Sequence, residues 1–345
     1  MKRILDIGFG RQTLFALYKS SHMSSRLQYG LAQLEYKYHI EHISWAPFNL
    51  KGLFINNLKV LRQCDVVYMT YLYIQPILLL ALLRRCGFYR RRKLLAISHV
   101  PLRDGRNKME SIILRMSYGA FDKILFHSQI NMEESINNGM IDRKLCEFLY
   151  WGDDLDYIDS QIKFSQGLSF LSTGREHRDF FTLVNAFSKI PKANLEIYTN
   201  LINYDNDYQT ISHIKDIYPN IKINFVSKSS ETTKELAQKA GECFCVVIPV
   251  EKKEMYYCIG FTSVVEAMAM SKPIISTRNP YYPINIEKEG FGLYADDEES
   301  WIKAINYLYS NPGIAAEMGR KGRKLAEEKF NILECSKQID RLINE

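Results

Sequence analysis

The sequence predicts an α/β fold of two Rossmann-like domains, each built on a parallel sheet and facing a central cleft. Strand and helix patterns alternate along most of the chain, and this alternation implies parallel sheets covered on both faces. The alternation stops near 150–167 and then starts again, and 345 residues exceed one ordinary core. We therefore expect domains at 1–152 and 168–345 joined by a linker at 153–167. The last helix is the one element that we allow to pack back on the first domain.

The first domain opens with a strand pattern at 2–10 that ends in a glycine-rich turn, and a helix capped by Ser24 or Ser25 follows over 24–38. The later elements are strands 38–44 and 64–71, helix 76–87, strand 93–100, helix 108–121, strand 123–128 and helix 129–139. Ligands of open parallel sheets bind outside the carboxyl ends of the strands. Gly8, Gly10, His99 and Ser128 fall at such ends.

The second domain repeats the alternation without repeating the sequence. We expect strand 168–175, helix 179–190, strand 194–200, helix 208–219, strand 221–228, helix 232–241 and strand 243–250. A loop, helix, turn and buried strand follow over 258–278, and helices close the domain within 292–330.

Composition narrows the class of protein. With 46% hydrophobic and 24% charged residues the chain is expected to be globular and soluble. Seven scattered cysteines without a CxxC pair indicate reduced thiols and a cytoplasmic protein, and neither a signal peptide nor a run of about 18 apolar residues is present. Cys243 and Cys245 share one face of a strand pattern, which favours core packing over metal binding.

The net charge of +6 is unevenly distributed, because residues 1–152 hold 22 Lys and Arg against 11 Asp and Glu. A basic cluster beside apolar residues is suited to an anionic membrane surface, here the inner face of the cell membrane, and a solvated helix end is the alternative. No nucleic-acid-binding motif is present, so we expect no nucleic acid partner. The cluster consists of Arg84, Arg85, Arg90, Arg91, Arg92 and Lys93.

The stretch 258–278 carries the clearest chemistry. A helix opened by Thr262 or Ser263 after Gly260 offers unpaired backbone N–H groups that suit a phosphate. Glu266 lies one turn further on, where a carboxylate can accept two hydrogen bonds from the diol of a ribose. Together they predict a nucleotide site; an ordinary amphipathic helix with a solvated Glu266 is the alternative.

Two arginines follow the first strand of the second domain. The strand ends in Thr173 and Gly174, and Arg175 and Arg178 come directly after it. A guanidinium is always charged and forks onto phosphate oxygens, so the pair is suited to a diphosphate. Surface pairing of Arg178 with Glu176 or Asp179 is the alternative.

These segments resemble glycosyltransferase family 4 and its relatives, the group 1 enzymes of GT-B architecture. The donor-site helix of that family has a Glu, seven residues, a second Glu, Ala-Met-Ala, a small residue, Lys-Pro and a strand. Glu266 matches the second Glu, whereas Cys258 stands at the position of the first. The resemblance extends to the strand and basic residues at 168–187, to 126–158 with Gly152 and Asp154, and to 292–330.

The resemblance implies an enzyme that moves a sugar from a nucleotide diphosphate sugar to a hydroxyl of a glycan or lipid-linked glycan, in surface polysaccharide synthesis and with retained configuration. The residues expected to act in catalysis are His99, Arg178 and Glu266. The donor-binding residues are Thr173, Gly174, Arg175, Arg178, Gly260, Thr262, Ser263 and Glu266, and those at the acceptor are Gly8, Gly10, His99 and Arg103.

His99 ends a strand of the first domain, where an imidazole can hydrogen-bond a sugar hydroxyl or act as a base. A buried histidine bonded to backbone is the alternative for His99, and His127 is expected to pack within its strand.

We expect no cofactor and no metal. The two Asp-x-Asp spacings, Asp154/Asp156 and Asp205/Asp207, lie in the linker and in a turn, where carboxylates serve as caps. Two arginines and a helix N-terminus would stabilise the departing diphosphate instead.

Two other functions stay open. One is a nucleotide-sugar 2-epimerase of the same architecture, which needs no acceptor. The other is a catalytically silent nucleotide-binding scaffold of a polysaccharide assembly complex, which the Cys258 departure suggests.

Overall fold

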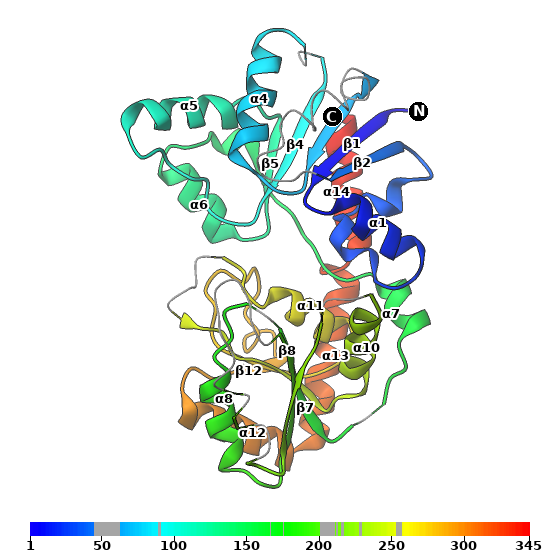
Figure 1. Cartoon of the computed structure of the whole chain (residues 1–345), viewed down its shortest axis with the longest axis vertical. Coiled ribbons are helices and arrows are strands. Elements are labelled where there is room, and N and C mark those ends of the chain that lie inside the picture. The colour runs from blue at the N-terminus through cyan, green and yellow to red at the C-terminus, as the bar shows by residue number, and fades with distance from the viewer. Residues whose placement is uncertain are drawn as a thin grey trace. The chain divides into compact units, whose positions relative to one another are not determined.

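The protein is represented by a computed structural model that divides into two compact units. Unit 1 comprises Met1–Ser21, Ser25–Trp151 and Ile332–Glu345, and unit 2 comprises His22–Ser24 and Gly152–Asn331 (Figure 1). The structure describes residues 1–44, 63–88, 91–165, 167–174, 176–200, 211, 213–214, 217–227, 230–252 and 257–345. The predicted α/β class, with a parallel sheet in each of two Rossmann-like units, is confirmed.

Unit 1 is built on a parallel six-stranded sheet of order β2-β1-β3-β4-β5-β6. The strand order reverses between β1 and β3, so the loops after these two strands diverge and leave a crevice for ligands. The strands are β1 (Arg3–Gly8), β2 (His39–Ser44), β3 (Val66–Met69), β4 (Lys93–Ser98), β5 (Lys123–Phe126) and β6 (Cys146–Phe148).

Alternate strand residues of unit 1 face two different layers. Leu5 and Val67 pack in one core with residues of α4 and α5, whereas Tyr68, next along β3, lies near Cys335 of α14. The helices are α1 (Arg11–Lys19), α4 (Ile74–Arg85), α5 (Lys108–Tyr118), α6 (Gln129–Asn137) and α14 (Ile332–Asn344). Within the described residues no helix has the length and apolarity to cross a bilayer.

The helix α14 is held to unit 1 at three places. The Nζ of Lys37 pairs with Asp340 at 2.6 Å, Lys93 Nζ donates to the carbonyl of Leu342 at 2.6 Å, and Lys2 Nζ donates to the carbonyl of Ile343 at 2.9 Å. The last two contacts place cations at carbonyls that a helix C-terminus leaves without partners.

The helix predicted over 24–38 is wrong, because two short 3-10 helices occupy it: η1 (Ser25–Gln28) and η2 (Ala32–Leu34). Tyr29 and Gly30 between them have positive φ angles of 49° and 84°, which a continuous helix cannot contain. A Cβ on Gly30 would lie 2.9 Å from the backbone of Ser336, so α14 packs closely on this break only because residue 30 is a glycine. The helix α1, in contrast, was not predicted.

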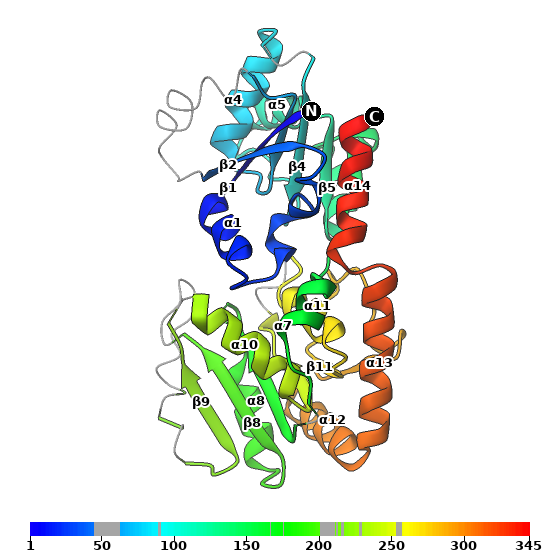
Figure 2. The same ribbon diagram turned by 90° about the vertical axis from the view of Figure 1, so that its right-hand side faces the viewer.

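Unit 2 holds a second parallel sheet, of order β12-β11-β10-β7-β8-β9, with β9 at one edge (Figure 2). Seen from that edge it has the strand order of a dinucleotide-binding Rossmann sheet, and the order reverses between β7 and β10. The strands are β7 (Ser169–Thr173), β8 (Asn194–Thr199), β9 (Ile221–Phe225), β10 (Cys245–Ile248), β11 (Ile274–Ser276) and β12 (Gly292–Tyr294).

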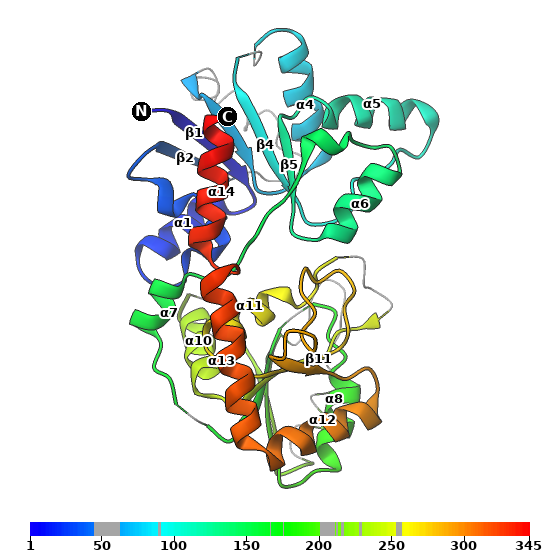
Figure 3. The ribbon, with the colours of Figure 1, turned by 180° about the vertical axis from the view of Figure 1, so that it is seen from behind.

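Helices cover both faces of this sheet. Phe170 and Phe187 pack with Trp301 in a core between the sheet, α8 and α12, and α11 and α13 pack together on the other face (Figure 3). A Cβ on Gly319 would lie 2.0 Å from the carbonyl oxygen of Ser271, so this close approach needs a glycine. The helices are α7 (Leu155–Gln161), α8 (Phe180–Ser188), α10 (Ser230–Glu242), α11 (Phe261–Ala269), α12 (Glu298–Ser310) and α13 (Pro312–Glu328). Half of the expected helix 208–219 lies outside the described residues.

Candidate functional site

The side chain of Arg178 lies at the carboxyl end of β7. Its guanidinium packs on Gly174, where a Cβ would come within 2.5 Å of Arg178 Nε. Its Nη1 donates to the carbonyl oxygen of Glu176 at 2.8 Å, and only 6% of the residue is exposed. A buried cation is thus placed where the strand order of unit 2 reverses.

The loop that carries Arg178 is tied to the end of β10. The backbone N–H of Asp179 donates to the carbonyl of Pro249 at 3.2 Å, and that of Glu251 donates to the carbonyl of His177 at 3.0 Å. The carboxylate of Asp179 caps α8 by accepting from the N–H of Thr182 at 3.0 Å. Asp179 thus has a local structural role, and Glu176 contributes its main-chain oxygen.

The first turn of α11 lies beside the same strand ends. The helix begins at Phe261 with Gly260 as its N-cap, so the prediction that Thr262 or Ser263 opens the helix is wrong. Gly260 has φ 83°, and a Cβ there would lie 2.7 Å from the hydroxyl of Tyr282 and 2.8 Å from Ile248. Glycine is therefore needed for both backbone conformation and space.

The polar side chains of α11 differ in burial and in position on the helix. Ser263 is buried, and its hydroxyl donates to the carbonyl of Thr173 at 3.4 Å, which joins α11 to the end of β7. Thr262 is exposed and Glu266 is half-buried. Because they are four residues apart, these two share one side of the helix.

Residues after β11 hold the loop that precedes α11. Asn279 Nδ2 donates to the carbonyls of Tyr257 at 3.0 Å and Ile259 at 3.3 Å, and the Tyr282 hydroxyl donates to the Ile259 carbonyl at 2.8 Å. The thiol of Cys258 donates to the carbonyl of Tyr281 at 2.9 Å. Burial raises the pKa of Tyr282, and the nearby charge of Arg178 opposes that shift. Sequence reasoning missed these contacts, although the turn-forming pair Asn279-Pro280, a few residues after β11, was a signal.

The structure brings together Thr173, Gly174, Arg178, Gly260 and Ser263. Arg175, Asp205 and Asp207 lie outside the described residues. Asp154 caps α7 by accepting from the N–H of Tyr157 at 3.1 Å. The residues that the structure describes contain no group of three or more His, Cys, Asp or Glu arranged for a metal. All seven cysteines are free, and burial raises the pKa of Cys243 to about 12.

In unit 1, His99 lies at the end of β4, half-buried. Its Nε2 lies 3.0 Å from the carbonyl oxygen of Thr70, and its ring lies 4.3 Å from that of Tyr71. Burial lowers the pKa of His99 to about 4, so the ring is neutral at pH 7. Since a carbonyl only accepts, Nε2 carries the proton and Nδ1 is left as an acceptor.

Aromatic rings surround His99. The rings of Tyr29 and His127 lie 5.7 and 5.3 Å from it, and Trp151 lies 5.5 Å from His127. His127 is buried, as expected, and its Nδ1 lies 3.2 Å from the carbonyl oxygen of Leu149. Burial lowers its pKa to about 3, so this cluster carries no imidazolium at neutral pH.

The structure places the other three predicted acceptor residues in different surroundings. Gly8 lies against Thr70, since a Cβ there would be 2.1 Å from Thr70 Oγ1, and Thr70 is also the partner of His99. Gly10 is the left-handed N-cap of α1, with φ 62°. Arg103 is exposed and pairs with Glu110 at 3.3 Å, so the structure does not bring it to His99.

A buried ionic cluster that sequence reasoning missed lies beside β1. Asp6 accepts from Arg11 Nε at 2.7 Å and lies 2.7 Å from His42 Nδ1, with Asp6 and Arg11 at most 1% exposed. Arg11 also donates to the Gln28 side chain at 2.9 Å. The Oδ1 of Asp6 has no hydrogen-bond partner among the described residues.

Part of the predicted basic cluster is used inside unit 1. Arg84 makes a bidentate pair with Asp122 at 2.6 and 2.8 Å, and Lys93 binds the end of α14. Arg85 donates to the carbonyl of Met116 at 3.0 Å. Arg91 is exposed, and Arg90 lies outside the described residues.

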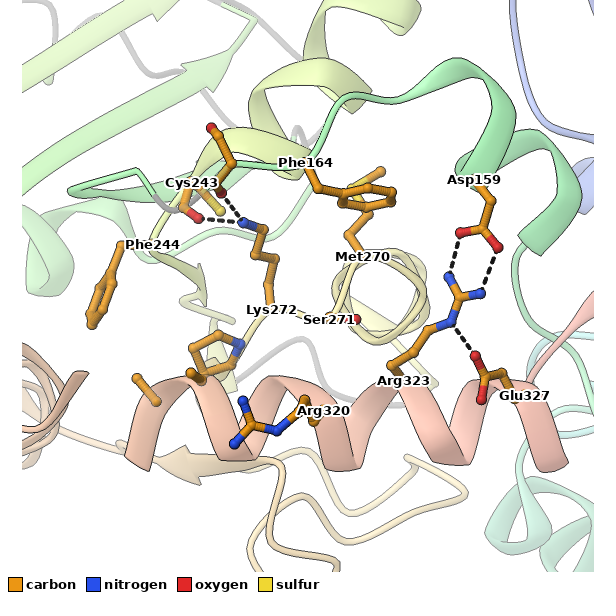
Figure 4. A pocket seen from close by; sticks show the side chains of 14 residues that line it. Asp159, Phe164, Cys243, Phe244, Met270, Ser271, Lys272, Arg320, Arg323 and Glu327 are labelled. Carbon is orange, nitrogen blue, oxygen red and sulfur yellow. Dashed lines mark hydrogen bonds and ion pairs between the residues drawn. The ribbon is translucent and has the colours of Figure 1, made fainter. Parts of the chain in front are cut away.

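A cavity of about 540 Å³ opens at the amino ends of β10 and β11, at the opposite end of the sheet from Gly174 and Gly260 (Figure 4). Lys272 points into it and donates to the carbonyls of Ser165 and Cys243, both at 2.8 Å. Arg323 pairs with Asp159 at 2.7 Å. The third cation at the cavity, Arg320, pairs with Glu317 at 2.6 Å, so all three cations have partners within unit 2.

Comparison with known proteins bears on the family of unit 2 and on the fold of the chain. Residues 167–325 match the family described as glycosyl transferases group 1. No curated protein matches the chain. Anabaena HepE, solved with UDP and glucose, is 15% identical over 100% of both chains with a TM-score of 0.66. A glycosyltransferase from Rickettsia africae is 14% identical over 99% of this chain and 97% of its own, with a TM-score of 0.67.

A UDP-GlcNAc 2-epimerase from Methanocaldococcus jannaschii also has this fold, at 14% identity over 100% of both chains and a TM-score of 0.59. At such identities the structural likeness establishes the fold alone. The family match then assigns the class: unit 2 carries a group 1 glycosyltransferase domain, and the chain is a glycosyltransferase of GT-B architecture.

Proposed function

We propose that this enzyme belongs with family 4 and transfers a sugar, with retention, from a UDP-sugar to a hydroxyl of a glycan or lipid-linked glycan in surface polysaccharide synthesis. The observation that carries the donor assignment is the Arg178 guanidinium packed on Gly174 beside the N-terminus of α11. Cation and helix end are the two features that hold a diphosphate without a metal. UDP is the first nucleotide to test because HepE is solved with it.

Each donor residue has a role in this proposal. Arg178 and the first turn of α11 neutralise the diphosphate as it departs, with Arg175 as a second cation. Gly174 lets the Arg178 guanidinium pack on the end of β7, Gly260 lets the loop before α11 approach Tyr282 and Ile248, and Ser263 holds α11 against Thr173. Glu266 accepts from the ribose hydroxyls on the same side of the helix as Thr262.

The acceptor is assigned to unit 1. Neutral His99 presents Nδ1 as a hydrogen-bond acceptor for a sugar hydroxyl, and the Tyr71 ring lies beside it, tilted by 30°. Aromatic faces and neutral acceptors suit sugars, whose rings present C–H faces and hydroxyl edges. Gly8 and Gly10 shape the loop next to Thr70, and Arg103 contacts a more distant part of the acceptor.

Calorimetry with UDP, GDP, CMP and ADP, without added metal, tests the donor site. We expect UDP to bind selectively and Glu266→Ala to weaken it by about 10-fold or more, since a hydrogen bond to a charged group contributes about 1.5–3 kcal/mol. Glu299→Ala on α12, 78% exposed, is the matched control and keeps wild-type affinity. Binding of no nucleotide would exclude the donor assignment.

The likeness to a 2-epimerase favours one second candidate. An epimerase converts its nucleotide sugar without an acceptor, so NMR of UDP-GlcNAc incubated with the enzyme alone decides between them. We expect no 2-epimer. A silent scaffold, suggested by Cys258, would instead bind nucleotide and transfer nothing across a broad acceptor panel.

A further inference from the structure

We propose that the outer face of α5 docks on an anionic lipid bilayer. Four large apolar side chains project from this helix into solvent: Met109 is 72% exposed, Ile112 49%, Ile113 45% and Met116 46%. Their spacing of three, four and seven residues places them on one side of the helix, and we call this set the α5 stripe. In Figures 1 and 3, α5 lies at the outside of unit 1.

The α5 stripe is not the face that attaches the helix to its unit. Leu114 and Tyr118, which are 1% and 3% exposed, fill that role in the core shared with α4. The helix therefore has a second apolar face that folding of unit 1 does not use. A contiguous exposed apolar face of this kind marks an interaction surface.

Cations border the α5 stripe. Arg106, Lys108 and Arg115 are exposed and form no ion pair with any residue that the structure describes. At 100° per residue, Lys108 and Arg115 lie together on one flank of the stripe. Arg85, bonded to the Met116 carbonyl at 3.0 Å, adds a fourth cation at its end.

The nearby acidic groups are turned to local partners. Glu110 accepts from the backbone N–H of Arg106 at 2.9 Å and pairs with Arg103 at 3.3 Å. Asp104 accepts from the N–H of Gly105 at 2.7 Å. Four cations, Arg103, Arg106, Lys108 and Arg115, outnumber the carboxylates of Asp104 and Glu110, so the net charge beside the stripe is positive.

This combination selects the occupant. Apolar side chains that enter the interface, flanked by cations that meet anionic headgroups, are the pattern of an interfacial helix. A second copy docked by two-fold symmetry through the same stripe would place Lys108 and Arg115 near their own copies, and like charges would oppose it. Docking through α5 uses no residue of unit 2, so it is independent of nucleotide binding.

Vesicle co-sedimentation of the full chain tests the surface. Wild type is expected to bind phosphatidylcholine vesicles with about one third phosphatidylglycerol, to bind pure phosphatidylcholine weakly, and to be released near 1 M salt, where the Debye length is about 3 Å. Ile112→Gln/Met116→Gln should bind about 10-fold or more weakly. Ile314→Gln/Leu333→Gln, at 39% and 47% exposure on α13 and α14, is the matched control and should bind like wild type.

A charge variant separates the electrostatic contribution to vesicle binding from the apolar one. Lys108→Gln/Arg115→Gln should lose about 10-fold on the anionic vesicles and leave the weak binding to pure phosphatidylcholine unchanged. Circular dichroism and UDP titration check that each variant is folded. Equal vesicle binding by the stripe variant, or no sedimentation of wild type, would overturn the proposal. A dimer in sedimentation velocity that the stripe variant abolishes, without vesicle binding, would assign the stripe to a second copy instead.

Discussion

The carboxyl ends of the two parallel sheets are equivalent positions in two Rossmann-like units, but the side chains there differ in charge. In unit 2 a buried guanidinium, Arg178, lies beside the first turn of α11. In unit 1 the corresponding end holds neutral His99 among aromatic rings. The architecture thus places ligands at these strand ends, and in our proposal the loop residues decide whether the ligand is an anion or a neutral sugar.

Unit 1 does contain strong charges, but it places them elsewhere. Asp6 and Arg11 neutralise each other within the unit, with His42 against the same carboxylate. Unit 2 places its buried cation in a loop at the ligand end. The comparison predicts that charge removal damages stability in unit 1 and catalysis in unit 2.

The largest effect is expected from Asp6→Ala, which leaves Arg11 buried without its carboxylate. Breaking a buried pair on one side costs about 3–5 kcal/mol, so the free energy of unfolding should fall by that amount. Urea denaturation measures it, with Asp142→Ala, 68% exposed, as control. A loss near that of the control would mean that the cluster is not stabilising.

Arg178→Met should act on catalysis instead. Removing one preorganised electrostatic group costs about 10²-fold or more in rate, so kcat for sugar transfer should fall by at least this factor. Arg320→Met, 66% exposed in the same unit, should retain wild-type kcat. If kcat falls by less than about 3-fold, well short of the loss expected for a preorganised charged group, Arg178 does not act in catalysis.

Gly174→Ala tests whether the position of the Arg178 guanidinium matters, without removing its charge. The new Cβ would lie 2.5 Å from Arg178 Nε, so the guanidinium must move. Misplacement of a catalytic group by about 1 Å can lower the rate by up to 10²-fold, and we expect kcat of Gly174→Ala to fall by about 10-fold. Gly313→Ala is the control, because a Cβ there meets nothing within 4 Å. Unchanged activity in Gly174→Ala would show that this packing is not needed.

The smallest expected effect is the dependence of folding stability on pH. The pKa values of His99 and His127, about 4 and about 3, lie below the unfolded value of about 6.5, so the folded state binds fewer protons between these limits. Their contribution to stability is complete above pH 6.5 and is lost as pH falls towards 3–4. Unfolding near pH 5 should show a proton uptake that drops by about one in each single variant, His99→Gln or His127→Gln. Uptake that neither variant changes would contradict the neutral cluster.

Much of this fold was accessible from the sequence, because strand and helix periods are local signals. The two alternating series, the strand ends at Thr173 and His99, and the helix before Lys272 all came from such patterns. The break at Tyr29 and Gly30 was not accessible, since it depends on packing against Ser336, three hundred residues away. The ionic cluster was missed for the same reason: Asp6 is a strand residue like its neighbours until Arg11 and His42 are brought to it.

For the candidate site, the sequence identified residue types and the structure supplied their neighbours. Gly174 and Arg178 were proposed together, but their direct packing is a tertiary fact. Gly260, not a hydroxyl side chain, caps α11, because Tyr282 and Ile248 leave no room for a Cβ. The catalytic and binding roles themselves stay predictions.

The position of α14 has a consequence for biosynthesis. This helix completes unit 1, with Asp340 and the Leu342 carbonyl bound by Lys37 and Lys93, yet the ribosome makes it only after all of unit 2. Domains fold largely as units during synthesis, so unit 2 can finish first while Tyr68 and its neighbours wait uncovered. A nascent chain released before α14 would expose apolar surface to chaperones, and a fragment ending at Trp151 is a poor choice for expression.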